Sequence, residues 1–266
     1  MTQYLFNELY KLLSFKIDLN TAIMTDVDGT ISKIVSNPED AVVSDSMKEL
    51  LAQLNKKFKI VGVISGRPLS QVTMMVGVEG LFYSGSHGLE YLKDGKIITV
   101  KDAEKYRPFM QELVQKLKNE DSLNIEGLEL ENKGICLSLH YRKCKKDPEL
   151  GERIFETVNQ VLNEDKLRID SGRKIVELKP PLIQDKGTIL EKIVKEYSIK
   201  KLIYLGDDIT DFDAFSKLKE LEHKRKIESA TILVSSREIP DFIKNCAQFY
   251  VNNVWEVQKF FKWLIS

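Results

Sequence analysis

The stretch Ala22-Ile23-Met24-Thr25-Asp26-Val27-Asp28-Gly29-Thr30 decides the fold of this chain. It joins an apolar run, typical of a buried β-strand, to a turn that carries two acidic side chains. A second stretch has the same design, because Leu202-Ile203-Tyr204-Leu205 leads into Gly206-Asp207-Asp208-Ile209-Thr210-Asp211. In an open parallel sheet, ligands bind in a crevice at the carboxyl ends of the strands. The two acidic clusters are therefore expected to meet in one crevice and to form a Mg²⁺ site.

Apolar runs and helical patterns alternate on both sides of the first stretch. Further strands are predicted at 59–64, 81–83, 231–234 and 249–251, and helices at 44–54, 185–197, 211–221 and after Asn253. The apolar spacing over residues 4–13 predicts a short amphipathic helix. This alternation predicts a doubly wound, Rossmann-like α/β core with a parallel sheet.

Residues 104–178 follow another pattern. Helices are predicted at 108–117 and 148–162, and β-hairpins around 132–134 and 171–173. Helix, hairpin, helix, hairpin is an α+β order, not a strand-helix-strand repeat. We therefore expect an inserted α+β lid at 104–178 and a core made of 1–103 and 179–266.

The composition excludes several classes of protein. The 266 residues are 42% apolar, which is enough for a sizeable core, and the 40 basic and 40 acidic side chains cancel. We therefore expect neither a nucleic-acid nor a membrane partner. Three cysteines without a CxxC spacing favour a reduced, cytoplasmic setting over a disulfide framework. The first residues are too polar for a signal peptide, and there is no apolar run of about 18 residues.

Two carboxylates two residues apart, Asp26 and Asp28, point to the same side of an extended segment. They would repel each other unless a cation or a shared proton lies between them. With Mg²⁺, one could attack phosphorus while the other manages a proton. The alternative is an ordinary solvated Asp-Gly turn.

Other segments weaken that alternative. Capping of a helix explains one acid of 206–211 but not three, which are costly together unless a metal offsets them. Ser65-Gly66-Arg67 offers a hydroxyl and approachable backbone N–H groups at a strand end. Lys186, at a predicted helix start, can neutralise phosphate charge, although a single lysine is more often simply exposed.

The order DxDGT, SGR, lysine and GDDITD resembles the haloacid dehalogenase superfamily of aspartate-nucleophile phosphatases. The segments 85–90, 131–134, 139–142, 172–177 and 206–215 look like those of the trehalose-6-phosphate phosphatases, and the resemblance spans residues 22–216. Two positions depart from that family. Lys179 stands where an arginine commonly precedes the proline, and Val27 where the residue is often aromatic.

The resemblance implies roles for the residues of the core. Asp26 would attack phosphorus, and Asp28 would protonate the leaving sugar oxygen and then activate water. Ser65 and Lys186 would hold the phosphoryl oxygens. Mg²⁺ would be held by the Asp26 carboxylate, the Asp28 carbonyl and Asp207, with Asp208 and Asp211 as nearby ligands or supports.

The resemblance also implies a substrate site. The residues expected to bind substrate are Gly66, Arg67, His87, Glu131, Lys133, Arg142, Lys174 and Glu177. In the lid, the alternative is that these are exposed strand residues with paired charges. The resemblance favours binding for Glu131, Lys133 and Glu177, whereas Arg142 could instead brace its hairpin. His87 lies in a glycine-flanked turn without a nucleophile elbow nearby, so we expect it to shape the pocket rather than act as a base.

The implied activity is Mg²⁺-dependent hydrolysis of trehalose 6-phosphate through an aspartyl-phosphate, the last step of trehalose biosynthesis. Sucrose phosphate or glucosylglycerol phosphate are alternative substrates, and a regulatory partner of a trehalose-phosphate synthase is an alternative without catalysis. A nucleotide-binding module is disfavoured, because neither GxxxxGK[ST] nor GxGxxG follows a strand. We expect a monomer.

Overall fold

The structure is a computed structural model that describes residues 2–35, 37–162, 167–172, 174–236 and 244–266. The chain divides into two compact units, each with its own core. The core unit consists of Met1–Ile98 and Gln184–Ser266, and the insert unit of Thr99–Ile183. The bounds of the insert unit lie slightly outside the 104–178 expected from sequence.

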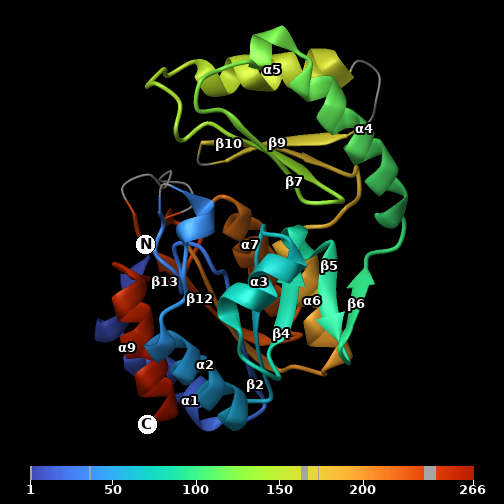
Figure 1. Ribbon diagram of the computed structural model, residues 1–266. Coiled ribbons are helices and arrows are strands. Elements are labelled where there is room, and N and C mark those ends of the chain that lie inside the picture. Colours follow the sequence, from blue (N-terminus) through green and yellow to red (C-terminus); the bar gives the residue numbers. More distant parts are fainter. Residues whose placement is uncertain (1, 36, 163–166, 173, 237–243) are drawn as a thin grey trace. The chain divides into compact units, whose positions relative to one another are not determined.

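The core unit is built on one sheet with the strand order β1-β13-β12-β11-β2-β3-β4-β5-β6 (Figure 1). The strands are β1 Gln3–Tyr4, β2 Thr21–Thr25, β3 Ile60–Ile64, β4 Phe82–Gly85, β5 Glu90–Lys93, β6 Lys96–Thr99, β11 Lys201–Gly206, β12 Glu228–Val234 and β13 Phe249–Val251. From β1 to β4, neighbouring strands pair in parallel, and β5 pairs antiparallel with β4. Strand β2, which precedes Asp26, therefore lies between β11 and β3.

Helices cover both faces of this sheet, as the sequence predicted. The helices are α1 Leu13–Ile17, α2 Asp45–Lys57, α3 Leu69–Val76, α6 Lys186–Glu196, α7 Thr210–His223 and α9 Val254–Ile265. In β2, Ile23 packs in the apolar cluster of α2, α3 and α9, whereas Ala22 and Met24 pack in that of α6 and α7. Burial on both faces explains why β2 is apolar without alternation. The doubly wound α/β core is confirmed.

Two predicted helix starts are also confirmed. The Ser44 hydroxyl accepts a hydrogen bond from the Met47 N–H at 3.4 Å, at the start of α2. The Asn253 side chain accepts one from the Glu256 N–H at 3.1 Å, at the start of α9. Such caps satisfy backbone N–H groups that a helix start leaves without intrahelical partners.

The N-terminus differs from the predicted helix over 4–13. Residues 3–4 form strand β1, paired with β13, and Leu5–Asn7 and Leu9–Leu12 are 3₁₀ turns before the short helix α1. The edge of the sheet offers hydrogen bonds to an extended chain, and Leu5 and Leu12 are still buried. Tertiary pairing has therefore overridden the local apolar spacing.

The hairpin β5–β6 was missed, although a signal was present. The turn residues Asp94 and Gly95 have left-handed φ values of 50° and 72°. An Asp-Gly pair in this conformation is typical of a two-residue hairpin turn.

The insert unit has a four-stranded antiparallel sheet in the order β7-β8-β10-β9. Its elements are α4 Arg107–Lys118, β7 Glu129–Asn132, β8 Leu137–His140, α5 Leu150–Leu162, β9 Arg168–Gly172 and β10 Ile175–Lys179. Leu139 and Val176 pack in one cluster with residues of α4 and α5, whereas alternate positions such as Ser138 and Glu177 lie on the opposite face. Arg173, in the second predicted turn, lies outside the described residues.

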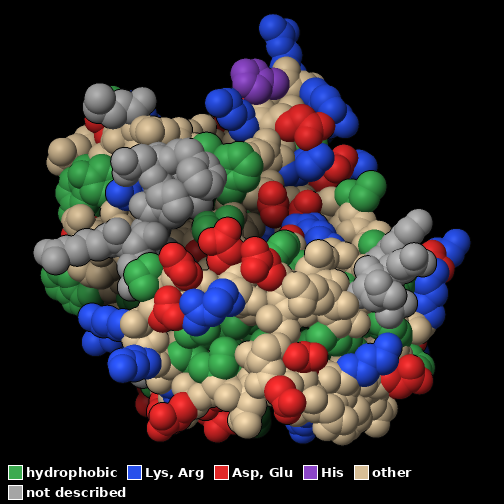
Figure 2. All heavy atoms as spheres, turned by 90° about the horizontal axis from the view of Figure 1, so that it is seen from above, with side chains coloured by type: hydrophobic (Ala, Val, Ile, Leu, Met, Phe, Trp, Pro, Cys, Tyr) green, Lys and Arg blue, Asp and Glu red, His purple; other side chains and the backbone are tan. Residues whose placement is uncertain are grey.

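Both acidic and basic side chains are present on the face of the molecule shown in Figure 2, in keeping with the balanced composition. Among the described residues, no helix is both long and apolar enough to cross a bilayer.

Candidate active site

Asp26 and Lys186 form a buried ion pair at the carboxyl end of β2. The Asp26 N–H donates to the Leu205 carbonyl of β11 at 2.8 Å, which fixes its backbone. The Lys186 Nζ donates to Asp26 Oδ1 at 2.7 Å, and both side chains are nearly inaccessible to solvent. Lys186 is the first residue of α6, whose start is fixed by a capping box between Asp185 and Thr188. The helix start therefore aims the ammonium at Asp26.

Asp211, in the first turn of α7, lies at the centre of a second set of contacts. Its Oδ1 accepts from Lys186 Nζ at 2.7 Å and from the Tyr204 hydroxyl at 2.6 Å. Its Oδ2 accepts from the backbone N–H groups of Asp207 and Asp208 at 2.8 and 2.9 Å. Asp211 therefore holds both the lysine and the loop that carries the other two acids.

Three buried carboxylates could hold a metal ion. Asp26, Asp207 and Asp211 each offer one oxygen, and these oxygens lie within 4.8 Å of one another. An all-oxygen, anionic donor set suits a hard divalent cation. Gly29, at φ 84°, leaves room for this set, because a Cβ there would lie 2.0 Å from an Asp207 carboxylate oxygen.

Burial and neighbouring charges shift the protonation of this cluster. Burial raises the pKa of Asp26 above its usual range, Lys186 opposes the shift, and the charge of Asp211 adds to it. Burial alone would lower the pKa of Lys186, but Asp211 and Asp26 outweigh burial and raise it. Burial and the charge of Asp211 raise the pKa of Tyr204 well above its usual range. The lysine is therefore charged and the tyrosine remains a neutral donor.

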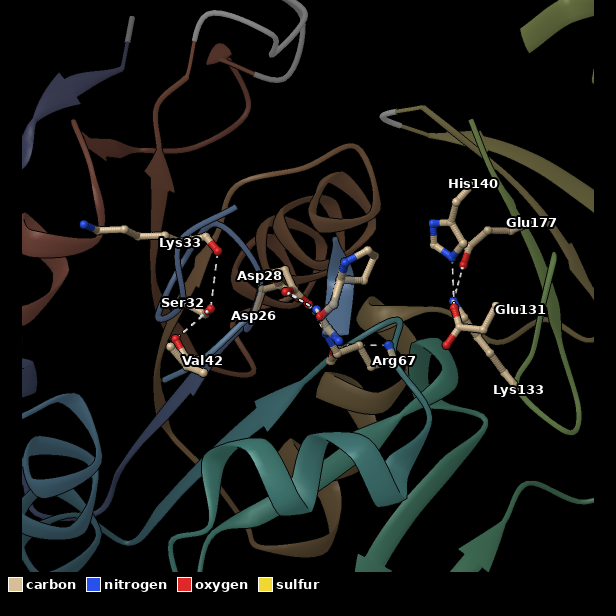
Figure 3. A network of polar contacts seen from close by, with 12 residues as sticks. Asp26, Asp28, Ser32, Lys33, Val42, Arg67, Glu131, Lys133, His140 and Glu177 are labelled. Carbon is tan, nitrogen blue, oxygen red and sulfur yellow. Dashed lines mark hydrogen bonds and ion pairs between the residues drawn. The ribbon is translucent and has the colours of Figure 1, made fainter. Parts of the chain in front are cut away.

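Asp28 forms a two-point contact with the guanidinium of Arg67 (Figure 3). Arg67 Nε donates to Asp28 Oδ2 at 2.6 Å, and Nη2 donates to Oδ1 at 2.8 Å. The same Nη2 donates to the Pro38 carbonyl at 2.9 Å. A bidentate contact of this kind fixes both groups. The sequence suggested that Arg67 binds substrate, but in this structure its guanidinium binds the Asp28 carboxylate.

The segment 65–67 is fixed by the strained turn after β4. The His87 N–H donates to the Ser65 carbonyl at 2.9 Å, and the Ser86 N–H donates to the Arg67 carbonyl at 2.7 Å. Ser86 and His87 both have left-handed backbones, with φ 49° and 57°. A Cβ on Gly66 would lie 2.6 Å from atoms of the His87 ring. His87 therefore packs against this segment, and only glycine fits opposite the ring.

In the insert unit, a charged network crosses the face of the sheet opposite α4 and α5. The network begins with Lys133, whose Nζ donates to Glu177 Oε1 at 2.9 Å and lies 3.9 Å from Glu131 Oε2. His140 Nε2 lies 2.9 Å from Glu131 Oε2 (Figure 3). The Ser138 hydroxyl donates to Glu177 Oε1 at 3.2 Å. The structure thus brings together Glu131, Lys133 and Glu177.

Lys174 and Arg142, the other two predicted lid residues, follow strands of the same sheet. Lys174 is exposed, and its Nζ lies 5.4 Å from the centre of the Tyr141 ring. Arg142 is half-buried just beyond β8.

The sequence analysis did not assign two residues of these networks, Lys179 and Tyr204, to the site. Lys179 is buried, and its Nζ lies 2.9 Å from Glu177 Oε2 and 3.2 Å from Asp170 Oδ2. Lys179 lies two positions beyond Glu177 on β10, so strand alternation could have placed both on one face. Tyr204 was read as part of an apolar run, which gives no signal that its hydroxyl has a polar partner.

The fold and the site together define a class of enzyme. An aspartate after β2, a serine after β3, a lysine at the start of α6 and acids after β11 are the parts of a phosphatase of the haloacid dehalogenase type. A family model described as trehalose-phosphatase matches residues 24–245. The chain belongs to the trehalose-phosphatase family.

Two curated relatives illustrate the similarity. "Probable trehalose-phosphate phosphatase 3" of Oryza sativa subsp. japonica is 32% identical over 259 residues, which cover 86% of this chain and 70% of the relative. "Trehalose-phosphate phosphatase" of Mycobacterium avium is 35% identical over 204 residues, which cover 74% of this chain and 51% of the relative. The chain therefore spans only part of the length of these proteins.

Solved structures support the fold. The C-terminal domain of C. albicans trehalose-6-phosphate phosphatase superposes with a TM-score of 0.81 at 23% identity, and the match covers 100% of this chain and 98% of that one. A haloacid dehalogenase-like hydrolase from Bacteroides thetaiotaomicron superposes with a TM-score of 0.62 at 13% identity, over 92% of this chain and 99% of that one. At such identities the likeness shows the fold alone.

Proposed function

We propose that this protein hydrolyses trehalose 6-phosphate to trehalose and phosphate. The observation that carries the proposal is the Asp26–Lys186 pair at the carboxyl end of β2, with Asp207 and Asp211 beside it. Membership of the trehalose-phosphatase family and the names of the curated relatives support the choice of substrate.

We assign a magnesium site to this cluster. Its carboxylates fit the metal, because they are buried, anionic and all-oxygen. Asp26, Asp207 and the Asp28 carbonyl would hold the ion. When bound, Mg²⁺ would neutralise part of the charge of the phosphoryl oxygens.

The chemistry is assigned to side chains of the core unit. Asp26 attacks phosphorus, the bond from phosphorus to the sugar oxygen breaks, and an aspartyl-phosphate forms. Asp28 gives a proton to the leaving sugar oxygen and later takes one from the water that hydrolyses the aspartyl-phosphate. The Ser65 hydroxyl and the Lys186 ammonium donate to the phosphoryl oxygens, and Arg67 keeps the Asp28 carboxylate oriented.

Sugar recognition is assigned to the insert unit. Glu131, Lys133 and Glu177 offer both donors and acceptors, which neutral sugar hydroxyls require. Arg142 follows β8, and Lys174 lies in the turn between β9 and β10. A site built to bond hydroxyls discriminates strongly against ligands that lack them. Sucrose phosphate and glucosylglycerol phosphate, whose hydroxyls are arranged differently, are the competing substrates.

The test is phosphate release with Mg²⁺ from trehalose 6-phosphate, sucrose 6-phosphate, glucosylglycerol phosphate and p-nitrophenyl phosphate. We expect preference for trehalose 6-phosphate and loss of release with EDTA or in Asp26→Asn. Asp94→Asn is the matched control, because Asp94 is an exposed turn residue and asparagine tolerates its left-handed backbone. Preference for another sugar phosphate would move the substrate assignment, and no release by folded, Mg²⁺-loaded protein would overturn the proposal.

A regulatory role is the second candidate. The C-terminal domain of a Candida albicans trehalose synthase regulatory protein superposes with a TM-score of 0.71 at 15% identity. Such a role would make a trehalose-phosphate synthase the partner. The intact set of Asp26, Asp28, Lys186 and Asp207 favours catalysis, and biological activity that survives Asp26→Asn would favour regulation instead.

A further inference from the structure

Tyr204 is a fully buried tyrosine that the proposed chemistry leaves without a role. Its ring packs edge-on against Phe215 of α7, with ring centroids 5.9 Å apart. Its hydroxyl donates to Asp211 Oδ1 at 2.6 Å. A phenylalanine would fill the same space in β11 without a polar atom, so packing alone does not account for the hydroxyl.

Asp211 is saturated by its four donors. A carboxylate accepts about four hydrogen bonds, and Tyr204, Lys186 and the N–H groups of Asp207 and Asp208 supply four. A metal ion could therefore bind Asp211 directly only if one of these bonds broke. In contrast, Asp26 accepts from Lys186 through Oδ1 alone in the hydrogen bonds seen here.

We infer that Tyr204 is a positioning residue for the phosphatase reaction. Its hydroxyl fixes the Asp211 carboxylate, and Asp211 in turn places the Lys186 ammonium and the loop that presents Asp207. Asp211 is in this arrangement an internal acceptor, whereas Asp26 and Asp207 bind the metal. The inference rests on the proposed function for the roles of Asp26 and Lys186.

The test removes the hydroxyl and keeps the ring. Tyr204→Phe leaves the contact with Phe215 in place, so we expect the variant to fold. Because a buried hydrogen bond to a charged group is lost, kcat should fall about 10- to 100-fold with KM little changed. The Mg²⁺ dissociation constant, measured by calorimetry without substrate, should rise about tenfold, which is the change expected for a support behind a metal ligand.

Tyr83→Phe is the matched control. Tyr83 is a buried tyrosine of β4 in the same sheet, and its hydroxyl bonds the backbone of Val78, in the loop before β4. We expect this variant to lose stability but to keep kcat and Mg²⁺ affinity. An equal loss of kcat in both variants would reduce Tyr204 to a structural role and overturn the inference.

A double-mutant cycle tests whether Tyr204 acts through Asp211. Tyr204→Phe combined with Asp211→Asn should be no worse in kcat and Mg²⁺ affinity than Asp211→Asn alone. Additive losses, or a Tyr204→Phe protein within about twofold of wild type in both quantities, would contradict the inference. The Mg²⁺ titration does not depend on the sugar, so it decides the role of Tyr204 even if trehalose 6-phosphate is not the substrate.

Discussion

The core unit and the insert unit each contain a charged network, and the two networks differ in charge balance. In the core unit, the carboxylates of Asp26, Asp207 and Asp211 lie close together, and one ammonium, that of Lys186, contacts Asp26 and Asp211. In the insert unit, three acids face three bases along one connected set of contacts. The acids are Glu131, Glu177 and Asp170, and the bases are Lys133, Lys179 and Arg168.

We propose that this difference separates a site built to receive a cation from a network whose charges are already paired. Buried like charges are costly unless a cation offsets them, so an excess of carboxylates is ready to receive a metal. A balanced network loses little when a neutral sugar exchanges some of its hydrogen bonds. The two networks are therefore suited to different ligands, a metal with a phosphoryl group in one case and an uncharged sugar in the other.

Removal of the Lys186 ammonium should have the largest effect, because it is the cation that Asp26 and Asp211 share. Lys186→Met leaves Asp26 and Asp211 buried without their shared cation. We expect phosphate release to fall at least about 10²-fold and the free energy of unfolding without metal to fall by about 3–5 kcal/mol. Urea denaturation with EDTA and with Mg²⁺ measures this loss, and Mg²⁺ should restore part of it.

Lys195→Met provides the control for this prediction. Lys195 lies on the same helix, is exposed, and pairs with Glu191 at 2.8 Å. An exposed pair of this kind contributes about 0.5 kcal/mol. Equal losses in the two variants would mean that burial of the Asp26 and Asp211 charges does not set the stability of the core unit.

Gly29 leaves the space that the Asp207 carboxylate occupies, so a larger residue at this position tests how tightly the core network is packed. In Gly29→Ala, the new Cβ would collide with the Asp207 carboxylate and force it to turn away. We expect Mg²⁺ affinity to fall at least about tenfold and kcat to fall about 10²-fold, since small displacements at a reaction centre are costly. Calorimetry and phosphate release measure the two quantities.

Gly95→Ala is the control that separates backbone strain from the collision with Asp207. Gly95 has a similar left-handed φ of 72°, but a Cβ there meets no described atom within 4 Å. Both variants should lose about 1–2 kcal/mol of stability, and only Gly29→Ala should lose Mg²⁺ affinity. Unchanged Mg²⁺ affinity in Gly29→Ala would remove Asp207 from the metal site.

The insert network should respond mainly in substrate preference. Glu177→Gln removes the carboxylate shared by Lys133 and Lys179 and should lower kcat/KM for trehalose 6-phosphate about tenfold or more. Release from p-nitrophenyl phosphate, which has no sugar, should stay within about twofold. Glu129→Gln is the control. Glu129 lies on the same face of β7 as Glu131, but it is exposed and pairs with Lys143. Equal losses on both substrates would show that Glu177 does not select the sugar.

The sequence predicted the elements of the core because local signals and tertiary packing agree there. The apolar run before Asp26 and the cap at Ser44 are consistent with their surroundings, and both were found. At residues 3–17 the local signals and the tertiary packing conflict, because Gln3 and Tyr4 pair with β13 at the edge of the sheet. The predicted helix was wrong for that reason.

The parts of the site that could not be predicted are contacts between residues far apart in the sequence. Four motifs placed Asp26, Ser65, Lys186 and Asp207 at strand ends and helix starts. Motifs gave no information on the pairing of Asp28 with Arg67, or of Lys179 with Asp170, since each pair depends on which strands and loops become neighbours. Tyr204 is the extreme case, because its one polar atom contacts a residue that the sequence assigned to the metal.

The smallest expected effect comes from a carboxylate held mainly by neutral donors. Glu256 accepts from the Asn252 N–H at 2.8 Å and from the Tyr4 hydroxyl at 2.9 Å. Burial would raise the pKa of Glu256, but these hydrogen bonds outweigh burial and lower it. Its stabilising contribution is therefore complete above the unfolded-state pKa of about 4.3 and is lost as the pH falls through the lower folded-state pKa. Glu256→Gln should cost about 1 kcal/mol or less at neutral pH and leave phosphate release unchanged.

The pH dependence of unfolding distinguishes this arrangement from the two ionic networks. Urea denaturation at a series of pH values should show a shallower acid loss of stability in Glu256→Gln than in wild type or in Glu49→Gln, a substitution at an exposed glutamate of α2. A dependence as steep as that of wild type would mean that the neutral donors do not stabilise the Glu256 charge. A shallower one would show that a partly buried carboxylate can be satisfied without a cation, so that the excess of acids beside Lys186 reflects ligand binding rather than burial alone.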